Sequence, residues 1–236
     1  MAKTAIITGV GAGLGASLVR KFAREGYQVG MFSRSTDFTQ SLADELQQQN
    51  LTALPVSTDI ANPEQVAQGF AQVREQLGPV DLLINHAGNA AWGELDDLTS
   101  EGFEQSWRVC TYGSFLCSKE AATEMGNGGA ILFTGATSSI RGRGGAIAFS
   151  SAKFGMRGLA WALARELWPK GIHVAHIIID GIIDTPSLRT GDDVPDDEPL
   201  LDPNAIAQAY ADLVNQAPGA WTFEIELRPH NEAFFE

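Results

Sequence analysis

The sequence predicts a single α/β domain in which about seven strands form a doubly wound parallel sheet flanked by helices. Three observations predict this fold. Short apolar runs alternate with helical patterns, a glycine-rich turn follows the first run, and the 236 residues contain no internal repeat or dividing linker. Because a helix connects each strand to the next, the alternation predicts parallel strands joined by right-handed crossovers. We therefore expect residues 1–236 to form one domain.

The first half of the chain supplies four expected strands. An apolar run over 4–10 ends in the glycine-rich turn, and apolar side chains recur at four-residue steps from Leu14 in the helix that follows. Asn62 and Pro63 are typical of the N-cap and first position of a helix. The other elements expected here are strands over 27–33, 51–57 and 80–88 and helices over 41–49 and 62–78. The continuous apolar run 80–88 is typical of a strand buried on both faces.

The second half continues the alternation and then changes character. We expect a long helical region up to about Met125, a strand over 129–135, a helix over about 146–168 and a strand over 172–179. Residues 186–203 are interpreted as a substrate loop, because the stretch 191–199 is acidic and broken by proline. Residues 204–236 are expected to hold the C-terminal helix, which begins near Asp202 or Asn204, and a closing strand over 220–227.

Charge and composition argue against several classes of partner. The net charge of −13 and the pI near 4.6 argue against nucleic acid, whose binding requires clustered Lys and Arg. No segment approaches the roughly 20 apolar residues that span a bilayer.

The cysteines and histidines give two further expectations. Cys110 and Cys117 are seven residues apart on an expected helix and cannot pair comfortably, so a reducing, cytoplasmic setting is expected. His173 and His176 lie three apart on an expected strand and face opposite sides, so no metal site is predicted.

The turn after the first strand has the composition of a phosphate-binding loop. It reads TGVGAGLG, and glycine there allows positive φ angles and lets a pyrophosphate approach the amides at the helix N-terminus. The position between a strand and a helix favours dinucleotide binding. The alternative is that the glycines only permit tight packing. The residues proposed to bind are Thr8, Gly9, Gly13, Leu14 and Gly15.

The end of the second expected strand bears on the choice between two dinucleotides. NAD-binding proteins place an acidic residue there for the ribose hydroxyls, whereas this sequence has Ser33 and Arg34. An arginine can accept a 2′-phosphate, so NADP(H) is favoured over NAD(H). The alternative is a solvated arginine at the start of a helix.

Several short motifs in a fixed order resemble the short-chain dehydrogenase/reductase family over about residues 3–185. These are Thr8-Gly9-x3-Gly13-x-Gly15, the pair DI at 59–60, NHAG at 85–88 and a lysine at position 153 on a late helix. The resemblance implies a Rossmann-type fold, a nicotinamide dinucleotide cofactor, and a homodimer or homotetramer formed through helices around 100–125 and 146–168. It also implies that the cofactor contacts Asp59, Ile60, Asn85, Ala87, Gly88, Lys153, Gly181 and Thr185.

The same motifs also show where the sequence departs from the family. The family's reduction chemistry uses an Asn, a Ser, a Tyr and a Lys, and the first three positions fall on Cys110, Ala136 and Phe149. Only Lys153 remains, and Phe149 four residues earlier shares its helix face. Asp180 also stands where the segment over the nicotinamide usually has proline. The chain is therefore expected to be an atypical member without the usual proton relay.

Other groups could replace the missing donors. Ser138 is the first candidate, because it lies two residues beyond Ala136 in a loop that borders the expected site. The alternatives for Ser138, a solvated or capping hydroxyl, stay open. His86 is a second candidate, with a structural histidine behind the ribose as its alternative. Cys110 is interpreted as a packed core thiol.

Three functions fit these residues. The first is an NAD(P)-dependent oxidoreductase with an atypical active site, acting on an unidentified carbonyl or alcohol. The second is a dinucleotide-binding pseudoenzyme, a sensor or partner subunit without redox turnover, which the loss of Ser and Tyr supports. The third is a non-redox lyase or isomerase, because fold alone does not fix chemistry.

Overall fold

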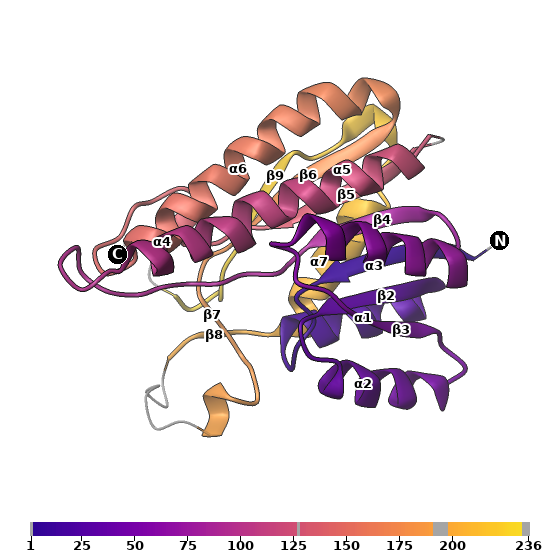
Figure 1. Ribbon diagram of the computed structural model, residues 1–236, viewed down its shortest axis with the longest axis horizontal. Helices are drawn as coiled ribbons and strands as arrows, with labels where there is room; N and C mark the ends of the chain where they lie inside the picture. The colour runs from indigo at the N-terminus through magenta and orange to yellow at the C-terminus, as the bar shows by residue number, and fades with distance from the viewer. Residues whose placement is uncertain (1, 127, 191–197, 233–236) are drawn as a thin grey trace.

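A seven-stranded parallel sheet lies between layers of helices in the computed structural model, which describes residues 2–126, 128–190 and 198–232 (Figure 1). The strands are β1 (Lys3–Thr8), β2 (Tyr27–Ser33), β3 (Ala53–Ser57), β4 (Val80–Asn85), β5 (Gly129–Thr134), β6 (Ile172–Ile179) and β9 (Glu224–Leu227). The helices are α1 (Leu14–Arg24), α2 (Asp37–Gln47), α3 (Pro63–Gln76), α4 (Ser100–Trp107), α5 (Ser114–Glu124), α6 (Ile147–Leu167) and α7 (Pro203–Val214). The predicted fold class is confirmed.

The strand order is β3-β2-β1-β4-β5-β6-β9, and every neighbouring pair is parallel. The order reverses between β1 and β4, so the crossovers leave this point in opposite directions. A crevice opens at the carboxyl ends of the strands where such a reversal occurs. The functional residues are expected along that crevice.

The two faces of the sheet form separate apolar cores. Successive strand residues point to opposite faces, so Ile7 and Leu82 belong to one core and Ile6 and Leu83 to the other. The first core is closed by α1, α2 and α7, and the second by α3, α5 and α6. The strands are therefore buried on both faces, as their continuous apolar runs predict.

Helix ends follow the sequence signals in part. Asn62 caps α3 by accepting hydrogen bonds from the amides of Glu64 at 2.9 Å and Gln65 at 3.2 Å. Asp202 caps α7 by accepting from the amide of Asn204 at 2.8 Å. The Gln65 side chain accepts from the amide of Asp59 instead of returning to the cap.

Several element boundaries differ from the prediction. The expected long helical region before Met125 begins only at α4, where Thr99 accepts from the amide of Gly102, and it continues through a π-helical turn, Arg108–Gly113, into α5. The strand expected over 80–88 ends at Asn85. The closing strand is reduced to β9, and a 3₁₀ turn over Pro218–Ala220 precedes it. The second helix begins at Asp37, four residues earlier than expected.

The segment after β6 forms a small structure of its own. β7 (Ile182–Ile183) pairs with β8 (Leu200–Leu201) to the left of β2 and β3 in Figure 1. Most of the acidic stretch 191–199, and with it the middle of the predicted substrate loop 186–203, lies outside the described residues. No helix in the described part of the chain has the length and apolar character needed to cross a membrane.

Candidate functional site

The glycine-rich turn packs directly against the end of β4. Gly9 has φ 71°, and a Cβ there would lie 2.4 Å from Cα of Ala87, so only glycine fits. The amides of Gly9 and Val10 both donate to the carbonyl of Phe32, which ties the turn to β2. The first turn of α1 contains no acidic residue. An anionic ligand at this helix end would therefore meet no competing carboxylate.

The end of the turn meets the segment after β6. Gly13 has φ 139°, and a Cβ there would lie 2.9 Å from Cγ2 of Thr185. Leu14 and Gly15 follow as the buried first residues of α1. The predicted phosphate-loop residues and Thr185 are thus brought together across the crevice.

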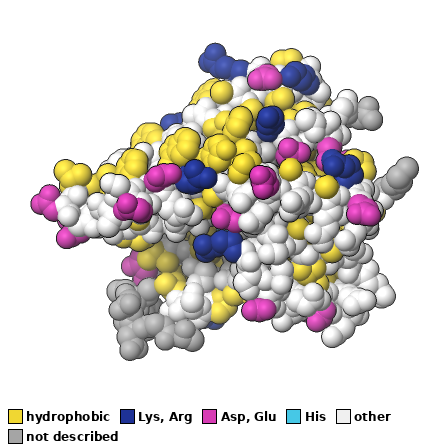
Figure 2. All heavy atoms as spheres, viewed as in Figure 1, with side chains coloured by type: hydrophobic (Ala, Val, Ile, Leu, Met, Phe, Trp, Pro, Cys, Tyr) yellow, Lys and Arg dark blue, Asp and Glu magenta, His cyan; other side chains and the backbone are white. Residues whose placement is uncertain are grey.

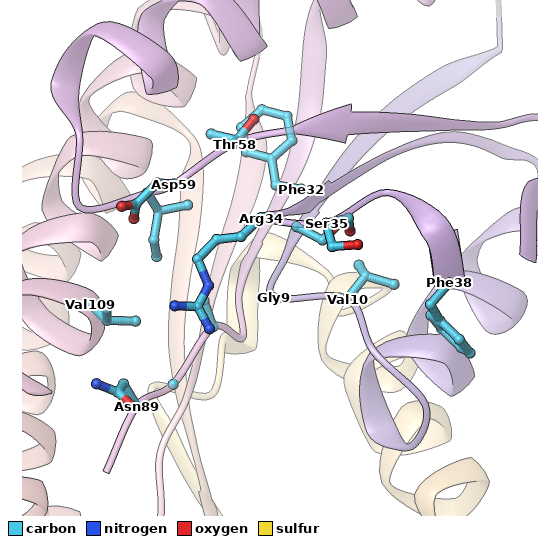
Figure 3. Close-up of a pocket in the computed structure, with 14 residues that line it drawn as sticks. Gly9, Val10, Phe32, Arg34, Ser35, Phe38, Thr58, Asp59, Asn89 and Val109 are labelled. Atoms are coloured by element: carbon cyan, nitrogen blue, oxygen red, sulfur yellow. The ribbon is translucent and has the colours of Figure 1, made fainter. Parts of the chain in front are cut away.

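A cavity of about 710 Å³ opens beside this turn, at the carboxyl ends of β1, β2 and β4. Figure 3 shows the Arg34 side chain extending into it from the end of β2. The cavity is lined by Gly9, Val10, Phe32, Ser33, Arg34, Ser35, Phe38, Thr58, Asp59, Ile60, Ala87, Gly88, Asn89 and Val109. The predicted residues Arg34, Asp59, Ile60, Ala87 and Gly88 are all in this set.

Asp59 is held at the cavity wall by short-range contacts. Its carboxylate accepts a hydrogen bond from the amide of Ala61 at 3.0 Å, and its own amide donates to Gln65 Oε1 at 2.8 Å. The side chain of the next residue, Ile60, packs against Gly113, where an added Cβ would lie 2.7 Å from Ile60 Cδ1. The π-helical turn thus fits against the cavity only because residue 113 lacks a side chain.

Two predicted residues lie behind the cavity wall. Thr8 Oγ1 accepts hydrogen bonds from the amides of His86 at 3.0 Å and Ala87 at 3.1 Å, and Thr8 is buried. Asn85 is buried as well, and its Nδ2 donates to Ser118 Oγ at 3.1 Å. Both residues join neighbouring elements and thereby position Ala87 at the cavity.

Lys153 lies at the inner end of the site. Its Nζ donates to the carbonyl of Thr134 at 2.7 Å, lies 5.5 Å from the centroid of the Phe149 ring, and is 4.0 Å from the Cβ position of Gly88. The side chain is buried, and burial lowers the pKa of its ammonium below the usual value. The predicted shared face of Phe149 and Lys153 is confirmed.

Thr134 joins three groups beneath the site. Besides its carbonyl contact with Lys153, its Oγ1 accepts a hydrogen bond from the Tyr210 hydroxyl at 2.8 Å and contacts His86 Nδ1 at 3.3 Å. Burial, and then the positive charge of Lys153, lowers the pKa of His86 to about 4. His86 is therefore neutral at physiological pH, which favours the structural interpretation of this residue.

The positions where the family carries its Asn, Ser and Tyr hold Cys110, Ala136 and Phe149, and none of these has a hydroxyl group. Phe149 packs against Trp92, with the ring centroids 5.4 Å apart, and Trp92 is 62% exposed. Cys110 is buried and donates to the carbonyl of Asn89 at 3.5 Å, as expected for a packed thiol. Ala136 precedes a 3₁₀ turn, Thr137–Ser139, in which Ser138 is buried.

Some residues around the site carry no local sequence signal. Asn89, Val109 and Phe38 line the cavity, yet no motif includes them. Arg141 and Arg228 both donate to Asp180, although they lie 39 and 48 residues from it in the sequence. Such pairs become visible only when the sheet brings the segments together.

A parallel sheet with a glycine-rich first turn and a cavity beside its point of reversal defines a Rossmann-type protein. Residues 3–193 match the short chain dehydrogenase family. The chain therefore belongs to that family, and the predicted membership is confirmed.

Known relatives agree with this assignment. The chain is 34% identical to a short-chain dehydrogenase from Rhodopseudomonas palustris, with 97% and 99% of the two chains covered and a TM-score of 0.83. It is 26% identical to an alcohol dehydrogenase from Thermococcus sibiricus complexed with 5-hydroxy-NADP, with 98% of each chain covered and a TM-score of 0.88. Versicolorin reductase 1 of Aspergillus parasiticus is 28% identical over 138 residues, which are 58% of this chain and 53% of the relative. The chain thus spans about half the length of that reductase.

Proposed function

We propose that the protein is an NADP-linked oxidoreductase with an atypical active site that interconverts an unidentified carbonyl compound and its alcohol. The observation that carries the proposal is the cavity lined by the glycine-rich turn and Arg34, with the buried Lys153 beside Gly88 of its wall. Membership of the short-chain dehydrogenase family supports the same activity.

The residues present fit a nicotinamide dinucleotide. Gly9 and Gly13 have positive φ angles and leave space that a Cβ would fill, as a turn approached by a pyrophosphate requires. Asp59 and Ile60 would hold the adenine end, and Ala87, Gly88 and Lys153 the inner ribose, with Gly181 and Thr185 over the nicotinamide. When bound, the cofactor supplies or accepts the hydride.

NADP(H) is proposed as the preferred cofactor. Arg34 enters the cavity between Ser33 and Ser35, and its guanidinium is suited to a 2′-phosphate. The Thermococcus sibiricus relative was complexed with an NADP derivative, which supports the same choice.

The proton chemistry of this site must differ from the family pattern. Phe149 can neither donate nor accept a proton, and a positioned general acid typically contributes about 10² to 10⁴ in rate. Lys153 Nζ donates a hydrogen bond to the carbonyl of Thr134, and its remaining N–H groups can bind ribose hydroxyls. Ser138 remains the proposed hydrogen-bond donor to the substrate oxygen, with water as the proton source.

A second candidate function is dinucleotide binding without redox turnover, in a sensor or partner subunit. The packing of Phe149 between Trp92 and Lys153 favours it, because an apolar ring fills the place of the expected phenol. Cofactor binding does not depend on that phenol.

Turnover separates the two candidates. The protein is incubated with NADPH and a panel of aldehydes and ketones, and with NADP⁺ and a panel of alcohols, while the nicotinamide absorbance is followed. The oxidoreductase proposal predicts a change in absorbance with at least one class of substrate. Saturable NADPH binding with no turnover across the panel would favour the pseudoenzyme.

We also propose a homodimer or homotetramer. Figure 2 shows hydrophobic side chains gathered on the face formed by α5 and α6. The exposed aromatic residues of α4, α5 and α6 are Phe103, Trp107, Phe115, Phe154 and Trp161. An exposed apolar patch of this kind marks a protein contact.

Other apolar residues at the end of α6 and within it do not belong to this patch. Ala148 and Ala152 of α6 are buried within the chain, and Leu159 and Leu163 pack on the apolar core between α6 and the sheet. Trp168 donates its indole N–H to the carbonyl of Val174. These residues stabilise the fold, so the contact surface is proposed from the exposed aromatic residues alone.

A reducing compartment, the cytoplasm, is proposed for the protein. Cys110 and Cys117 are both free thiols and both buried. Chains that fold in oxidising compartments commonly pair their cysteines.

A further inference from the structure

Asp180, directly after β6, is the centre of a buried ionic cluster. Its Oδ1 accepts a hydrogen bond from the Thr137 hydroxyl, and its Oδ2 accepts from Arg141 at 2.6 Å and from Arg228. The Asp180 side chain is only 5% exposed. A carboxylate with so little solvent needs partners of this kind to remain charged.

The three donors come from two segments that are distant in the sequence. Thr137 and Arg141 belong to the loop between β5 and α6, residues 135–146, which we call the active-site loop because it includes Ala136, where the family carries its serine. Arg228 directly follows β9, and the backbone amide of Asp180 donates to the carbonyl of Leu227 at 2.9 Å. Asp180 thus ties the end of β6 both to the active-site loop and to the edge strand.

The segment that starts at Asp180 leads to the glycine-rich turn, which it meets at Thr185. We call residues 180–185 the strap. The middle of the strap pairs with β8, where the amide of Asp184 donates to the carbonyl of Leu201. At the far end of the strap, Thr185 lies against Gly13 of the glycine-rich turn. The strap is therefore fixed at both ends, and the Asp180 end lies beside the active-site loop.

We propose that Asp180 is a positioning residue for the nicotinamide half of the cofactor, because it locks the strap to the active-site loop. This inference rests on the proposed function. In the family a proline usually occupies this position and restricts only its own φ angle. Here the carboxylate instead links the strap to two other segments, so that the strap and the loop around Ser138 keep one relative placement.

The ion pairs explain why removal of the negative charge of Asp180 should disturb this protein. Removing one partner of a buried ion pair leaves the other charge uncompensated, which is more costly than never having had the pair. Without the Asp180 charge, Arg141 would lose its ion pair with the strap, and Arg228 would keep its pair with Glu226 but lose the one with Asp180, so the link between the strap and the two other segments would be broken. The strap would then move away from the loop, and contacts to the nicotinamide half would be lost while the adenosine half is unaffected.

A comparison of two ligands tests this prediction. Calorimetry is used to titrate NADPH and adenosine 2′,5′-bisphosphate, which lacks the nicotinamide half, into the wild type, Asp180→Asn and Arg141→Gln. Both variants are expected to bind NADPH at least about tenfold more weakly, while binding of the bisphosphate changes by less than about twofold. Retained bisphosphate binding also shows that a variant is folded.

Glu124→Gln is the matched control. Glu124 is also a buried carboxylate, 6% exposed, and it accepts from Arg74 at 2.5 Å and from the amide of Val80 at 2.9 Å. It is the last residue of α5 and contacts the amino end of β4, whereas Asp180 follows the carboxyl end of β6. This variant should leave the ratio of the two affinities unchanged.

Hydrogen exchange gives a measurement that does not require the cofactor. The amides of residues 181–185 and 137–141 should exchange faster in Asp180→Asn than in the wild type, and at wild-type rates in Glu124→Gln. Unchanged exchange, or equal weakening of both ligands, would overturn the proposed role of Asp180. If the wild type bound neither ligand, the proposed function would fail, and exchange alone would decide whether Asp180 locks the strap.

Discussion

Arg34 lines the cavity at the position proposed to meet the 2′-phosphate of NADP. Its guanidinium offers paired N–H donors that suit a phosphate, and no acidic residue stands at this position to hold the ribose hydroxyls of NAD. Arg34→Ala should weaken NADPH binding by about tenfold or more and leave NADH binding nearly unchanged. Calorimetric titration of both cofactors measures the ratio. Arg34→Lys, which keeps the charge without the fork of donors, should fall between; equal losses for both cofactors would contradict the assignment.

Phe149 determines which proton chemistry the site can perform. Its ring lies beside the Lys153 ammonium, so a hydroxyl added to the ring would be close to a positive charge that lowers a phenol pKa. Phe149→Tyr combined with Ala136→Ser should raise carbonyl reduction by about 10². The rate is followed by the nicotinamide absorbance across pH. Phe149→Leu combined with Ala136→Ser is the control that lacks the phenol, and an equal gain in both would argue against a restored proton donor.

The conformation of the glycine-rich turn depends on Gly9 much more than on Gly11. A Cβ on Gly9 would collide with Ala87 and would need a positive φ angle, whereas a Cβ on Gly11 meets no atom within 4 Å. Gly9→Ala should therefore lower the free energy of unfolding by about 1–3 kcal/mol and abolish cofactor binding. Gly11→Ala should preserve both. Thermal unfolding and NADPH titration compare the two, and similar losses in both variants would contradict this account of the turn.

Elements specified by local signals were predictable from the sequence. The N-cap at Asn62, the apolar strands and the glycine-rich turn all depend on residues close together in the chain, and the structure has them. The π-helical turn was not predictable, because Gly113 must accommodate Ile60 from a distant segment. The ion pairs of Asp180 escaped for the same reason, since partners 39 and 48 residues away leave no local pattern. Only the departure of Asp180 from the family's proline indicated that the position is unusual.

Stability of the whole molecule should decrease in mild acid. His86 has a pKa of about 4 in the folded protein and about 6.5 when exposed, because burial disfavours its charged form. Between these values the unfolded chain binds a proton that the folded chain does not, so the contribution of neutral His86 to stability is fully present above about pH 6.5 and is lost as the pH falls toward 4. The contribution of one such group is at most about 1.4 kcal/mol per pH unit.

His86→Gln isolates this contribution from that of the carboxylates. Urea unfolding from pH 7 to pH 4.5 should show a smaller decrease in the free energy of unfolding for the variant than for the wild type. Parallel pH dependences would show that His86 does not titrate on unfolding.

Assembly is the second property of the whole molecule that can be tested. Trp107 stacks on Tyr112, which in turn stacks on Phe115, so that aromatic rings follow one another along the surface of α4 and α5. Trp107→Ser combined with Phe115→Ser should shift the protein to a smaller assembly, because apolar surface no longer drives the contact. Light scattering coupled to size exclusion measures the mass. Phe38→Ser, at an exposed aromatic residue on α2, is the control, and an unchanged mass for the double variant would exclude this face as the contact.

The central claim is that the molecule keeps a working NADP site although the usual proton relay is absent. Calorimetric titration of the wild-type protein with NADPH and NADH tests it most directly. The account predicts saturable binding of NADPH to one site per chain, and weaker binding of NADH because Arg34 would then lack a phosphate partner. Absence of NADPH binding would contradict the claim, and tighter binding of NADH would contradict the role assigned to Arg34.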